Sequence, residues 1–552
     1  MKRFFLFGII ILFFAFQGSL WAALNVTFDI DTTADRGPIS PYIYGSNFTL
    51  GGDENLASRR IGGNRLTGYN WENNYSNAGS DWNHYSDQYL VRDVPQQQKL
   101  IPGIVLTCFH DSCLQEGLYS LVTLQMAGYV SADRNGTVTE QQSAPSYRWK
   151  EVVYAKPTLF CDPPDKPDLT DNYVYMDECV NFLVSIYGNA STPNGVRGYS
   201  LDNEPALWPY THPRIHPNLT GCQELISRSV ALASAVKNID PFAEIFGPSL
   251  YGFSAYESLQ SAPDWNSVKG RYSWFIDYYL DQMKQASDVQ ERRLLDVLDV
   301  HWYPEAGGGG SRITDSLASY SRENAEARMQ APRTLWDAGY CEDSWIGQWR
   351  RSYLPILPEI QNSIDTYYPG TKLAITEFYY GAPEHISGGI AMADVLGIFG
   401  KYGLYMSNYW GDDGSFVSAA YKIYRNYDCN NSTFGDIRVE AQMSDKQNSS
   451  IYASLSDVND SRLHLIVINK NFDYSINGVF SINSSTNYVS ARVWAFDSNS
   501  PNISEILPIE QISNNSFSYT IGPLTVCHIV LEPQMPSMIN DDDMEKNLRP
   551  IL

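Results

Sequence analysis

Short apolar segments alternate with longer amphipathic stretches over most of this chain, and this alternation limits the folds open to it. The segments expected to form strands are residues 42–44, 58–61, 118–126, 198–201, 244–246, 297–300, 373–376 and 404–407. Between them, residues 176–187 and 222–239 have helical spacing. Strands joined through helices pair in parallel, because each crossover returns the chain to the same end of the sheet. Eight such units over residues 40–428 predict an α/β fold, a (β/α)8 TIM-like barrel, with a doubly wound open sheet as the alternative.

A second pattern begins after residue 428, where helical spacing gives way to alternating strands. These strands are expected at residues 450–455, 463–469, 491–496, 517–521 and 527–531. Residues 429–535 are therefore predicted to form a second, all-β sandwich domain. Near the N-terminus, residues 26–30 also alternate, but no helix follows them. We expect residues 24–39 to supply a strand of the same sandwich, which would then be built from both chain ends.

The two ends of the chain carry patterns of export and of disorder. Lys2 and Arg3 precede an apolar run that leads to small residues ending at Ala23, which predicts a signal peptide over residues 1–23 and a secreted, extracellular protein. A membrane anchor is the alternative, although the polar residues 17–19 interrupt the apolar run. Residues 536–552 are predicted to be an acidic, disordered tail. The mature protein is expected to be a monomer that does not associate with membranes.

Composition excludes one class of partner and allows one kind of crosslink. The 552 residues include 39 Lys and Arg and 62 Asp and Glu, a net charge of −23. Nucleic-acid binding depends on Lys and Arg that neutralise phosphates, so no nucleic-acid partner is expected. Eight cysteines in a chain with an export signal allow disulfide bonds, and Cys108 and Cys113 could close a short loop. The sequence fixes no pairing.

Two glutamates follow expected barrel strands. Glu204 stands in the sequence Asp-Asn-Glu-Pro after residues 198–201, and Glu377 follows residues 373–376 directly. Chemistry in a βα barrel takes place at the C-terminal ends of the strands, so the two carboxyl groups would meet at one rim. Glycoside hydrolysis requires such a pair, one as acid/base and one as nucleophile or base. The structural alternative is that Glu204 caps a helix begun by Pro205 and Glu377 is an ordinary salt-bridge partner.

Other polar and aromatic residues near the expected strand ends would share this rim. They are Arg60, Asn64, Trp71, Asn203, His301, Tyr303, Trp345, Trp349, Tyr379 and Trp410. Aromatic rings offer apolar faces with polar edges, which suits a sugar ring, and the polar side chains can bond its hydroxyls. Trp345 and Trp349 are four residues apart and would share one helix face, either as a sugar-stacking platform or as part of the core.

Motifs of other enzyme classes are missing from the sequence. It contains no Gly-x-Ser-x-Gly elbow, no His-Glu-x-x-His and no phosphate loop. His212 and His216 have the spacing of a zinc pair, but Pro213 and Pro217 argue against a regular helix there. The four aspartates within residues 162–171 could ligate calcium or simply belong to a solvated loop.

Several stretches, taken together and in order, resemble glycoside hydrolase family 44. They are residues 60–65, 71–74, 200–205, 299–304 and 375–378, and the resemblance extends from about Leu24 to Pro533. The family's members are endo-acting β-1,4-glucanases, often also active on xyloglucan, with a barrel-like catalytic domain and a β-sandwich from both chain ends. The resemblance implies a β-glucan substrate and no cofactor for catalysis. Family members can carry a structural metal such as calcium, but its ligands here stay unknown.

The resemblance also implies a retaining mechanism. Glu204 would be the acid/base and Glu377 the nucleophile, with their carboxyl groups about 5 to 5.5 Å apart. A nearby ionised carboxylate would raise the pKa of Glu204 above that of the nucleophile. The positioning residues would be Arg60, Asn203, His301 and Tyr303, and the rings that stack on glucosyl units would be Trp71, Trp345, Trp349 and Trp410.

Two other functions stay open at this stage. One is a non-catalytic polysaccharide-binding protein that keeps the cleft without turnover. The other is a barrel glycosidase that acts on xylan or mannan, because the shape of the subsites, and not the carboxylate pair, selects the sugar.

Overall fold

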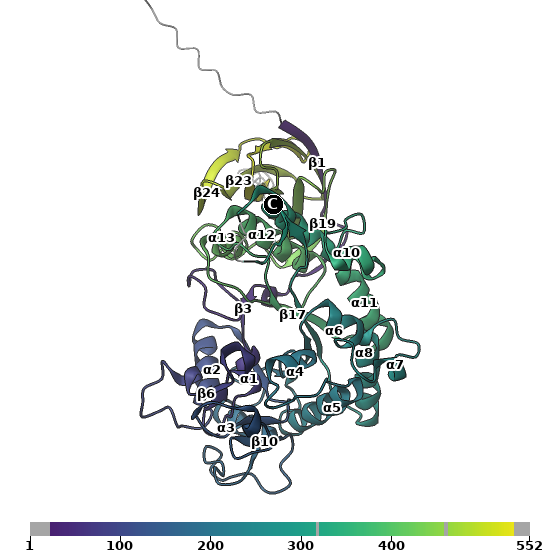
Figure 1. The fold of residues 1–552 in the computed structure, drawn as a ribbon. Helices are drawn as coiled ribbons and strands as arrows, with labels where there is room; N and C mark the ends of the chain where they lie inside the picture. The colour runs from purple at the N-terminus through teal and green to yellow at the C-terminus, as the bar shows by residue number, and fades with distance from the viewer. Residues whose placement is uncertain (1–22, 316–319, 457–461, 535–552) are drawn as a thin grey trace, which may run out of the picture.

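The computed structural model describes residues 23–315, 320–456 and 462–534. A parallel barrel ringed by helices forms one part of the molecule, and a largely antiparallel sheet with the C-terminal strands packs against it (Figure 1). The predicted signal peptide, apart from Ala23, and the predicted acidic tail lie outside the described residues.

Eight parallel strands close the barrel in the order β12, β13, β14, β17, β18, β3, β4, β7. Their bounds are Gly45–Ser46 (β3), Ser58–Ile61 (β4), Tyr119–Leu124 (β7), Gly198–Leu201 (β12), Glu244–Leu250 (β13), Val297–Trp302 (β14), Lys372–Phe378 (β17) and Met406–Tyr409 (β18). Closure leaves no open edge, so the barrel prediction is confirmed and the open sheet is excluded.

The first barrel strand lies further along the chain than predicted. Pro41–Ile43 form a 3-10 turn (η1), and the strand begins only at Gly45. The proline presets a helical φ, and the Ser40 hydroxyl accepts a hydrogen bond from the Tyr42 N–H. These local signals favour the turn over the extended conformation predicted for residues 42–44.

The last barrel strand, predicted at residues 404–407, is also displaced and spans Met406–Tyr409. The Leu404 N–H bonds the carbonyl of Phe399, so this residue still belongs to the cap of the preceding helix. Gly403 makes that cap with a φ of +66°, a conformation that glycine adopts without a Cβ penalty.

Helices surround the barrel. Their bounds are Asn64–Thr67 (α1), Ile104–Glu116 (α2), Met176–Tyr187 (α3), Trp208–Thr211 (α4), Cys222–Ile239 (α5), Phe253–Ser258 (α6), Trp265–Val268 (α7), Phe275–Val289 (α8), Arg322–Gln330 (α9), Trp345–Trp349 (α10), Ile356–Tyr367 (α11), Ile386–Lys401 (α12) and Ser415–Arg425 (α13). Short strands in the loops form three small sheets: β5 (Ser76–Asn77), β6 (Tyr85–Asp87) and β9 (Gly136–Thr137); β8 (Tyr129–Ser131), β10 (Trp149–Val153) and β11 (Tyr173–Tyr175); β15 (Gly307–Gly308) and β16 (Ser311–Arg312).

Helix α12 lies between the barrel and the second sheet (Figure 1), and its residues 386–400 are all buried. Gly397 faces the ring of Tyr452 on the sheet, and a Cβ at this glycine would lie 2.2 Å from a ring carbon. The close approach of helix and sheet therefore depends on the missing side chain.

The second sheet is built from ten strands and both chain ends. The strands are β1 (Ala23–Asp31), β2 (Gly37–Pro38), β19 (Ile437–Met443), β20 (Ser449–Leu455), β21 (Leu463–Asn469), β22 (Ser475–Asn483), β23 (Tyr488–Asp497), β24 (Ser500–Ile509), β25 (Ser516–Ile521) and β26 (Thr525–Pro533). β1 lies between β19, antiparallel, and β22, parallel. Val26, Phe28 and Ile30 point into the core of this sandwich, which confirms that its strands come from both ends. Helix α13 ends at Arg425 and β19 begins at Ile437, so the predicted boundary after residue 428 falls in their connection.

The disulfide bonds that the sequence allows are absent from the structure. All eight cysteines are unpaired, and Cys108 and Cys113 both lie on α2, where the first is exposed and the second is buried. Their side chains therefore leave the helix on different faces and cannot close a loop.

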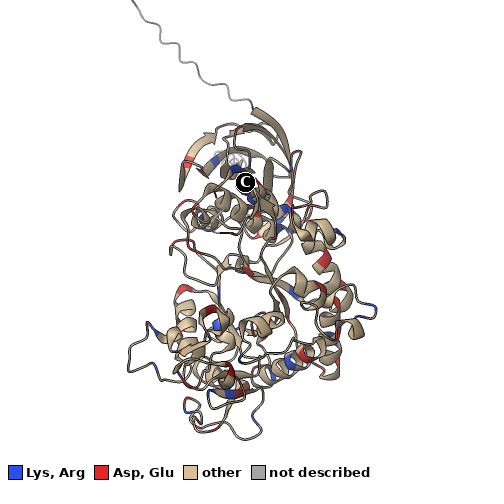
Figure 2. Cartoon of the chain, in the orientation of Figure 1, with Lys and Arg blue, Asp and Glu red and all other residues tan. Residues whose placement is uncertain are grey.

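Within the described residues, no helix has the length and apolar character needed to cross a membrane. Acidic and basic residues are interspersed along both parts of the molecule (Figure 2).

Candidate active site

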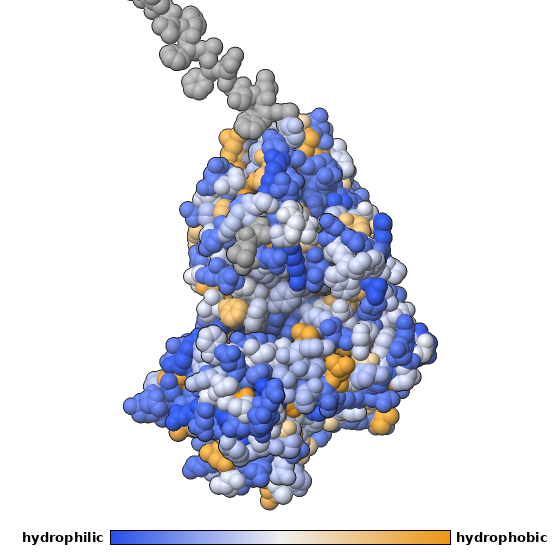
Figure 3. Space-filling model, in the orientation of Figure 1, coloured by the Kyte–Doolittle hydropathy of each residue, from blue (hydrophilic) through white to orange (hydrophobic). Residues whose placement is uncertain are grey.

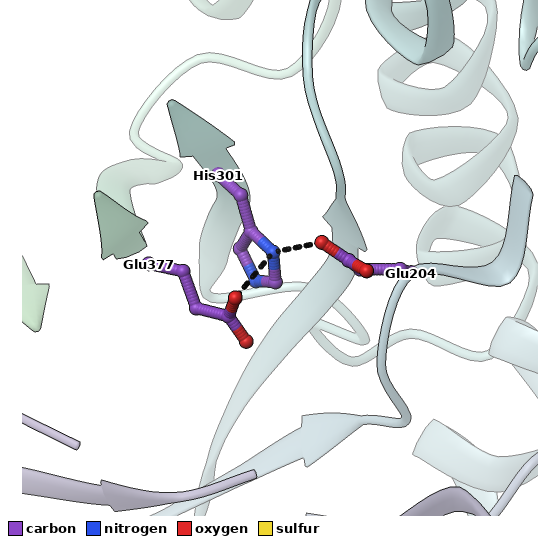
Figure 4. Close-up of side chains that lie close together, drawn as sticks. All are labelled: Glu204, His301 and Glu377. Atoms are coloured by element: carbon purple, nitrogen blue, oxygen red, sulfur yellow. Dashed lines mark hydrogen bonds and ion pairs between the residues drawn. The ribbon is translucent and has the colours of Figure 1, made fainter. Parts of the chain in front are cut away.

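The two predicted carboxylates meet at the mouth of the barrel. One carboxylate oxygen of Glu204, one of Glu377 and a ring nitrogen of His301 all lie within 4.8 Å of one another (Figure 4). Glu204 follows β12, His301 lies in β14 and Glu377 in β17. The C-terminal ends of three strands thus deliver these side chains to one point, as expected for a βα barrel.

A register shift between β14 and β17 brings His301 beside Glu377. Val300 pairs with Ile375, but the next residue, His301, pairs with Glu377, so Thr376 is skipped. Such an irregularity re-aims side chains at the end of a strand. With regular pairing His301 would lie opposite Thr376; because of the shift it lies opposite Glu377.

Glu204 occupies a left-handed turn. Its φ is +44° and its ψ is +58°, a region that residues other than glycine rarely adopt. It precedes the 3-10 helix η5 (Pro205–Leu207), but its side chain makes no capping hydrogen bond. Glu204 therefore does not cap this helix with its side chain, as the structural alternative had it. Its carboxyl group instead bonds Nδ1 of His301 at 2.9 Å.

Both oxygens of Glu377 accept hydrogen bonds. Nη1 of Arg60 donates to Oε1 at 2.7 Å, and the hydroxyl of Tyr303 donates to Oε2 at 2.7 Å. The second Nη of Arg60 donates to Oδ1 of Asn203 at 2.8 Å, and Nδ2 of Asn203 donates to Oδ1 of Asn64 at 3.2 Å. These bonds fix the orientation of Glu377 and link it to the turn that carries Glu204.

Burial sets the protonation of this centre. It raises the pKa of Glu204 to about 7, against a smaller lowering by the charge of Arg60, while Asp81 adds to the rise. The expected cause, a neighbouring ionised carboxylate, is therefore not the main one: loss of solvent around the carboxyl group is. Burial also lowers the pKa of His301, so its imidazole is neutral near pH 7.

Two pockets flank the carboxylate pair and share Tyr303 as a wall. One, of about 450 Å³, contains Glu204 and is lined by Leu207, Tyr251, Phe253, Trp302, Trp345 and other residues. The other, of about 520 Å³, is lined by Phe48, Tyr379, Trp410 and residues 411–413, which follow Trp410. The surface is hollowed at this level of the molecule, near β3 and β17 (Figure 3). Since Tyr303, which donates to Glu377, lines both pockets, we take them as two halves of one cleft across the barrel mouth.

Two of the predicted sugar-stacking tryptophans do not line this cleft. Trp71 is fully buried, its indole N–H bonds the carbonyl of Tyr175, and its ring stacks on Phe182. It is a core residue, and the prediction that it stacks on a sugar is wrong. Trp349 is 69% exposed and lies outside both pockets, whereas Trp345 lines one of them and packs against Phe253.

Sequence reasoning missed several cleft residues. Tyr251 follows β13, which continues to Leu250 beyond the end predicted at residue 246, so the sequence pattern did not place Tyr251 at a strand end. Phe48 follows β3 and was missed for the same reason. The amide of Asn47 bonds the Thr376 carbonyl at 2.9 Å, so this residue supports the strand that carries Glu377.

The candidate metal ligands serve other roles. Nε2 of His212 bonds the carbonyl of Asn64 and Nε2 of His216 bonds Glu224, so the two histidines do not form a zinc pair. In the chain between residues 23 and 534, gaps aside, Glu204, His301 and Glu377 make the one group of three or more such side chains whose donor atoms converge. Since Arg60 and Tyr303 already donate to Glu377, this donor set suits acid/base chemistry better than a cation.

The chain is similar in sequence and fold to known glycosidases. The model of glycoside hydrolase family 44 matches residues 75–306. The chain is 59% identical to endoglucanase A of Paenibacillus lautus over 525 residues, which is 94% of this chain and 74% of that protein. It is 53% identical to the beta-mannanase/endoglucanase A of Caldicellulosiruptor saccharolyticus, covering 90% of this chain but 38% of that protein.

A solved structure supports the same assignment. The xyloglucanase of Paenibacillus polymyxa from family 44 superposes with a TM-score of 0.90 at 60% identity, over 92% of this chain and all of that one. With these similarities over nearly the whole described chain, and with a carboxylate pair at the barrel mouth, the protein is a glycoside hydrolase and belongs to glycoside hydrolase family 44.

Proposed function

We propose that this enzyme is a secreted, endo-acting β-1,4-glucanase that hydrolyses cellulose-type glucans, xyloglucan or both, with retention of anomeric configuration. The observation that carries the mechanism is the approach of one oxygen of Glu204 to within 4.8 Å of one oxygen of Glu377. Retaining enzymes hold their carboxyl groups about 5 to 5.5 Å apart, whereas inverting enzymes leave roughly 6.5 to 9.5 Å for a water molecule.

In the first step Glu377 attacks the anomeric carbon while the glycosidic C–O bond breaks. Glu204, protonated because burial raises its pKa to about 7, gives its proton to the departing oxygen. The glycosyl unit is then held as an ester on Glu377. In the second step Glu204 takes a proton from water, the water oxygen bonds the anomeric carbon and Glu377 leaves. Arg60 and Tyr303 orient Glu377 in both steps.

The cleft accounts for internal cleavage of a polymer. The pocket that contains Glu204 would hold the departing part of the chain, because this residue protonates the leaving oxygen. The pocket beside Tyr379 and Trp410 would hold the part retained on Glu377. Aromatic walls on both sides suit the apolar faces of glucosyl rings. A cleft that continues beyond both carboxylates leaves room for a chain on either side of the cut bond.

The relatives support a glucan substrate: one is named an endoglucanase and another a xyloglucanase. The name of the Caldicellulosiruptor relative also includes mannanase, which keeps mannan among the substrates to be tested. The proposal of secretion rests on the sequence pattern of residues 1–23, and N-terminal sequencing of the protein from the culture medium of its source would test it.

The test of the whole proposal is activity on a panel of polymers. Viscosity and reducing sugar would be followed on xyloglucan, carboxymethylcellulose, xylan and mannan, for the unmodified enzyme and for Glu204→Gln and Glu377→Gln. We expect rapid loss of viscosity on a β-1,4-glucan and loss of that activity in both variants. Proton NMR of the first product should show the β anomer; the α anomer would overturn the retaining mechanism, and binding without cleavage would favour a polysaccharide-binding protein.

A further inference from the structure

Asp202 lies two residues before Glu204, and the mechanism above gives it no part. Its side chain is fully buried, yet its carboxylate accepts four hydrogen bonds. Oδ1 accepts from the Thr67 hydroxyl at 2.6 Å and from the Asn203 N–H at 2.8 Å. Oδ2 accepts from the N–H groups of Met126 and Ala127 at 2.5 and 2.9 Å. Every acceptor position that faces protein is thus in use.

These donors come from different parts of the barrel rim. Thr67 ends helix α1, which follows β4, while Met126 and Ala127 follow β7. Asp202 itself follows β12. Since β4, β7 and β12 are adjacent in the barrel, one carboxylate ties together the ends of three neighbouring strands.

The turn that Asp202 anchors is strained. Asp202 has a φ of +63° and Glu204 a φ of +44°, a left-handed conformation that is unfavourable for residues other than glycine. Aspartate tolerates this conformation because its side chain can bond the next backbone N–H, as Oδ1 does with Asn203. Glutamate has no such local bond, so its conformation depends on the surrounding contacts.

The same carboxylate is suited to act as an anion. Burial raises its pKa to about 6, and its bonds with Thr67 and the backbone N–H groups oppose that rise. A protonated oxygen would place an O–H against one of these donors, so ionisation and the observed geometry go together.

We propose that Asp202 is a positioning residue for the acid/base: it holds the turn of residues 202–204 in the conformation that aims the Glu204 carboxyl group at the glycosidic oxygen. The inference rests on the proposed function, because it takes Glu204 to be the proton donor. It is specific to proton donation. Glu377 is held by Arg60 and Tyr303; the Arg60 nitrogen that bonds Glu377 also bonds Asn47, whereas the bond to Asn203 comes from the other guanidinium nitrogen.

The test uses two substrates with the same sugar and different leaving groups. The leaving group of 2,4-dinitrophenyl β-cellotrioside departs without protonation, whereas that of 4-methoxyphenyl β-cellotrioside needs a proton from the acid. For each substrate, kcat/KM reports the steps up to the first irreversible one. For Asp202→Asn we expect kcat/KM to fall about 10- to 100-fold on the methoxyphenyl substrate and less than about 3-fold on the dinitrophenyl one. Glu204→Gln should show the same selectivity with a larger loss.

Asp277→Asn is the matched control. Asp277 is also buried, on α8, and accepts bonds from the Ser273 N–H, the Trp274 indole and the Ser363 hydroxyl, away from the barrel mouth. We expect it to lower thermal stability without any dependence on the leaving group. Thr67→Val removes one of the four donors to Asp202 with little change in shape, and a loss of about 2- to 5-fold confined to the methoxyphenyl substrate is expected even if Asp202→Asn does not fold.

The outcomes separate the two proposals. If Asp202→Asn and Thr67→Val lose activity equally on both substrates, or lose none, Asp202 does not position the acid and the inference is overturned. If Glu204→Gln itself shows no dependence on the leaving group, the assignment of Glu204 as acid fails, and the proposed function fails with it.

Discussion

Arg60 and Glu377 form a buried ion pair at the centre of the barrel mouth. Nη1 of Arg60 lies 2.7 Å from Oε1 of Glu377, and the exposed fractions of the two side chains are 0% and 6%. The other arm of the guanidinium bonds Asn203. A planar fork can serve both partners at once, which a single ammonium group cannot.

Arg60→Lys should therefore lower kcat by about 100-fold, because the lysine keeps the charge but cannot hold Glu377 and Asn203 in one geometry. Steady-state kinetics on the preferred glucan would measure this. Arg59→Lys is the control: the Arg59 side chain reaches Ser112 and the Phe109 ring outside the mouth, and this variant should stay within about 2-fold of the unmodified enzyme. Equal losses in both variants would contradict the prediction.

The pH dependence of activity should reflect Glu204. The acid must be protonated for the first step, and burial raises its pKa to about 7, so kcat/KM should fall as the pH rises through about 7. A pH profile of kcat/KM would locate this alkaline limb. In Glu204→Gln the limb should disappear from the residual activity; if it persists at the same pH, another group is responsible.

The same pKa predicts an effect on stability. The ordinary pKa of a glutamate is 4.5 and that of Glu204 in the folded protein is about 7, so between these pH values the folded state keeps a proton that the unfolded chain has released. Stability conferred by this group is therefore lost as the pH rises from 4.5 to 7. Glu204→Gln should increase the free energy of unfolding by on the order of 2–3 kcal/mol at pH 8 and leave it unchanged at pH 4. Urea unfolding at both pH values would show this, and equal stability at pH 8 would contradict it.

Two tryptophans from the same sequence prediction should behave differently. Trp345→Ala removes a wall of the pocket beside Glu204 and should raise KM for long oligosaccharides about 10-fold. Trp71→Ala leaves a cavity in the core and should lower the free energy of unfolding by about 3–5 kcal/mol, with KM of the folded enzyme unchanged. Kinetics and thermal unfolding of both variants would test the contrast, which an increase of KM in Trp71→Ala would contradict.

The meeting of Glu204 and Glu377 at the barrel mouth could be predicted, because the C-terminal strand ends of a βα barrel share one rim and apolar runs in the sequence reveal the strands. The roles of neighbouring residues depend on finer geometry. The shift that pairs His301 with Glu377 changes the register by one residue, and the periodicity of residues 297–302 and 372–378 does not predict it. The sequence also does not distinguish the buried Trp71 from Trp345 in the pocket, because burial depends on distant segments such as the one that carries Phe182.

Two of the sandwich strands that were not predicted, β22 and β24, can be explained. β22 alternates strictly, but Gly478 occupies an inward position where a Cβ would lie 2.8 Å from the Phe480 ring and 3.0 Å from that of Phe28. The glycine therefore masks the apolar pattern that its neighbours complete. In β24 most residues are exposed, so the strand lacks the buried face that a sequence pattern would reveal.

The junction of barrel and sandwich contains a buried ion pair. Nζ of Lys470, just after β21, lies 2.7 Å from Oδ2 of Asp394 on α12, and both side chains are at most 1% exposed. The Tyr452 hydroxyl donates to the other oxygen of Asp394. Removing one partner of such a pair leaves the other charge buried without compensation, which costs about 3–5 kcal/mol.

Asp394→Asn and Lys470→Met should each destabilise the protein by this amount, while the double variant should lose clearly less than their sum, because no charge is then left alone. Thermal and urea unfolding of the three variants would give the coupling. Asp473→Asn is the control: its partner Arg322 on α9 also links barrel and sandwich, but both side chains are about half exposed, so this variant should change stability far less. If Asp394→Asn cost no more than Asp473→Asn, the buried pair would not be what couples the two parts of the molecule.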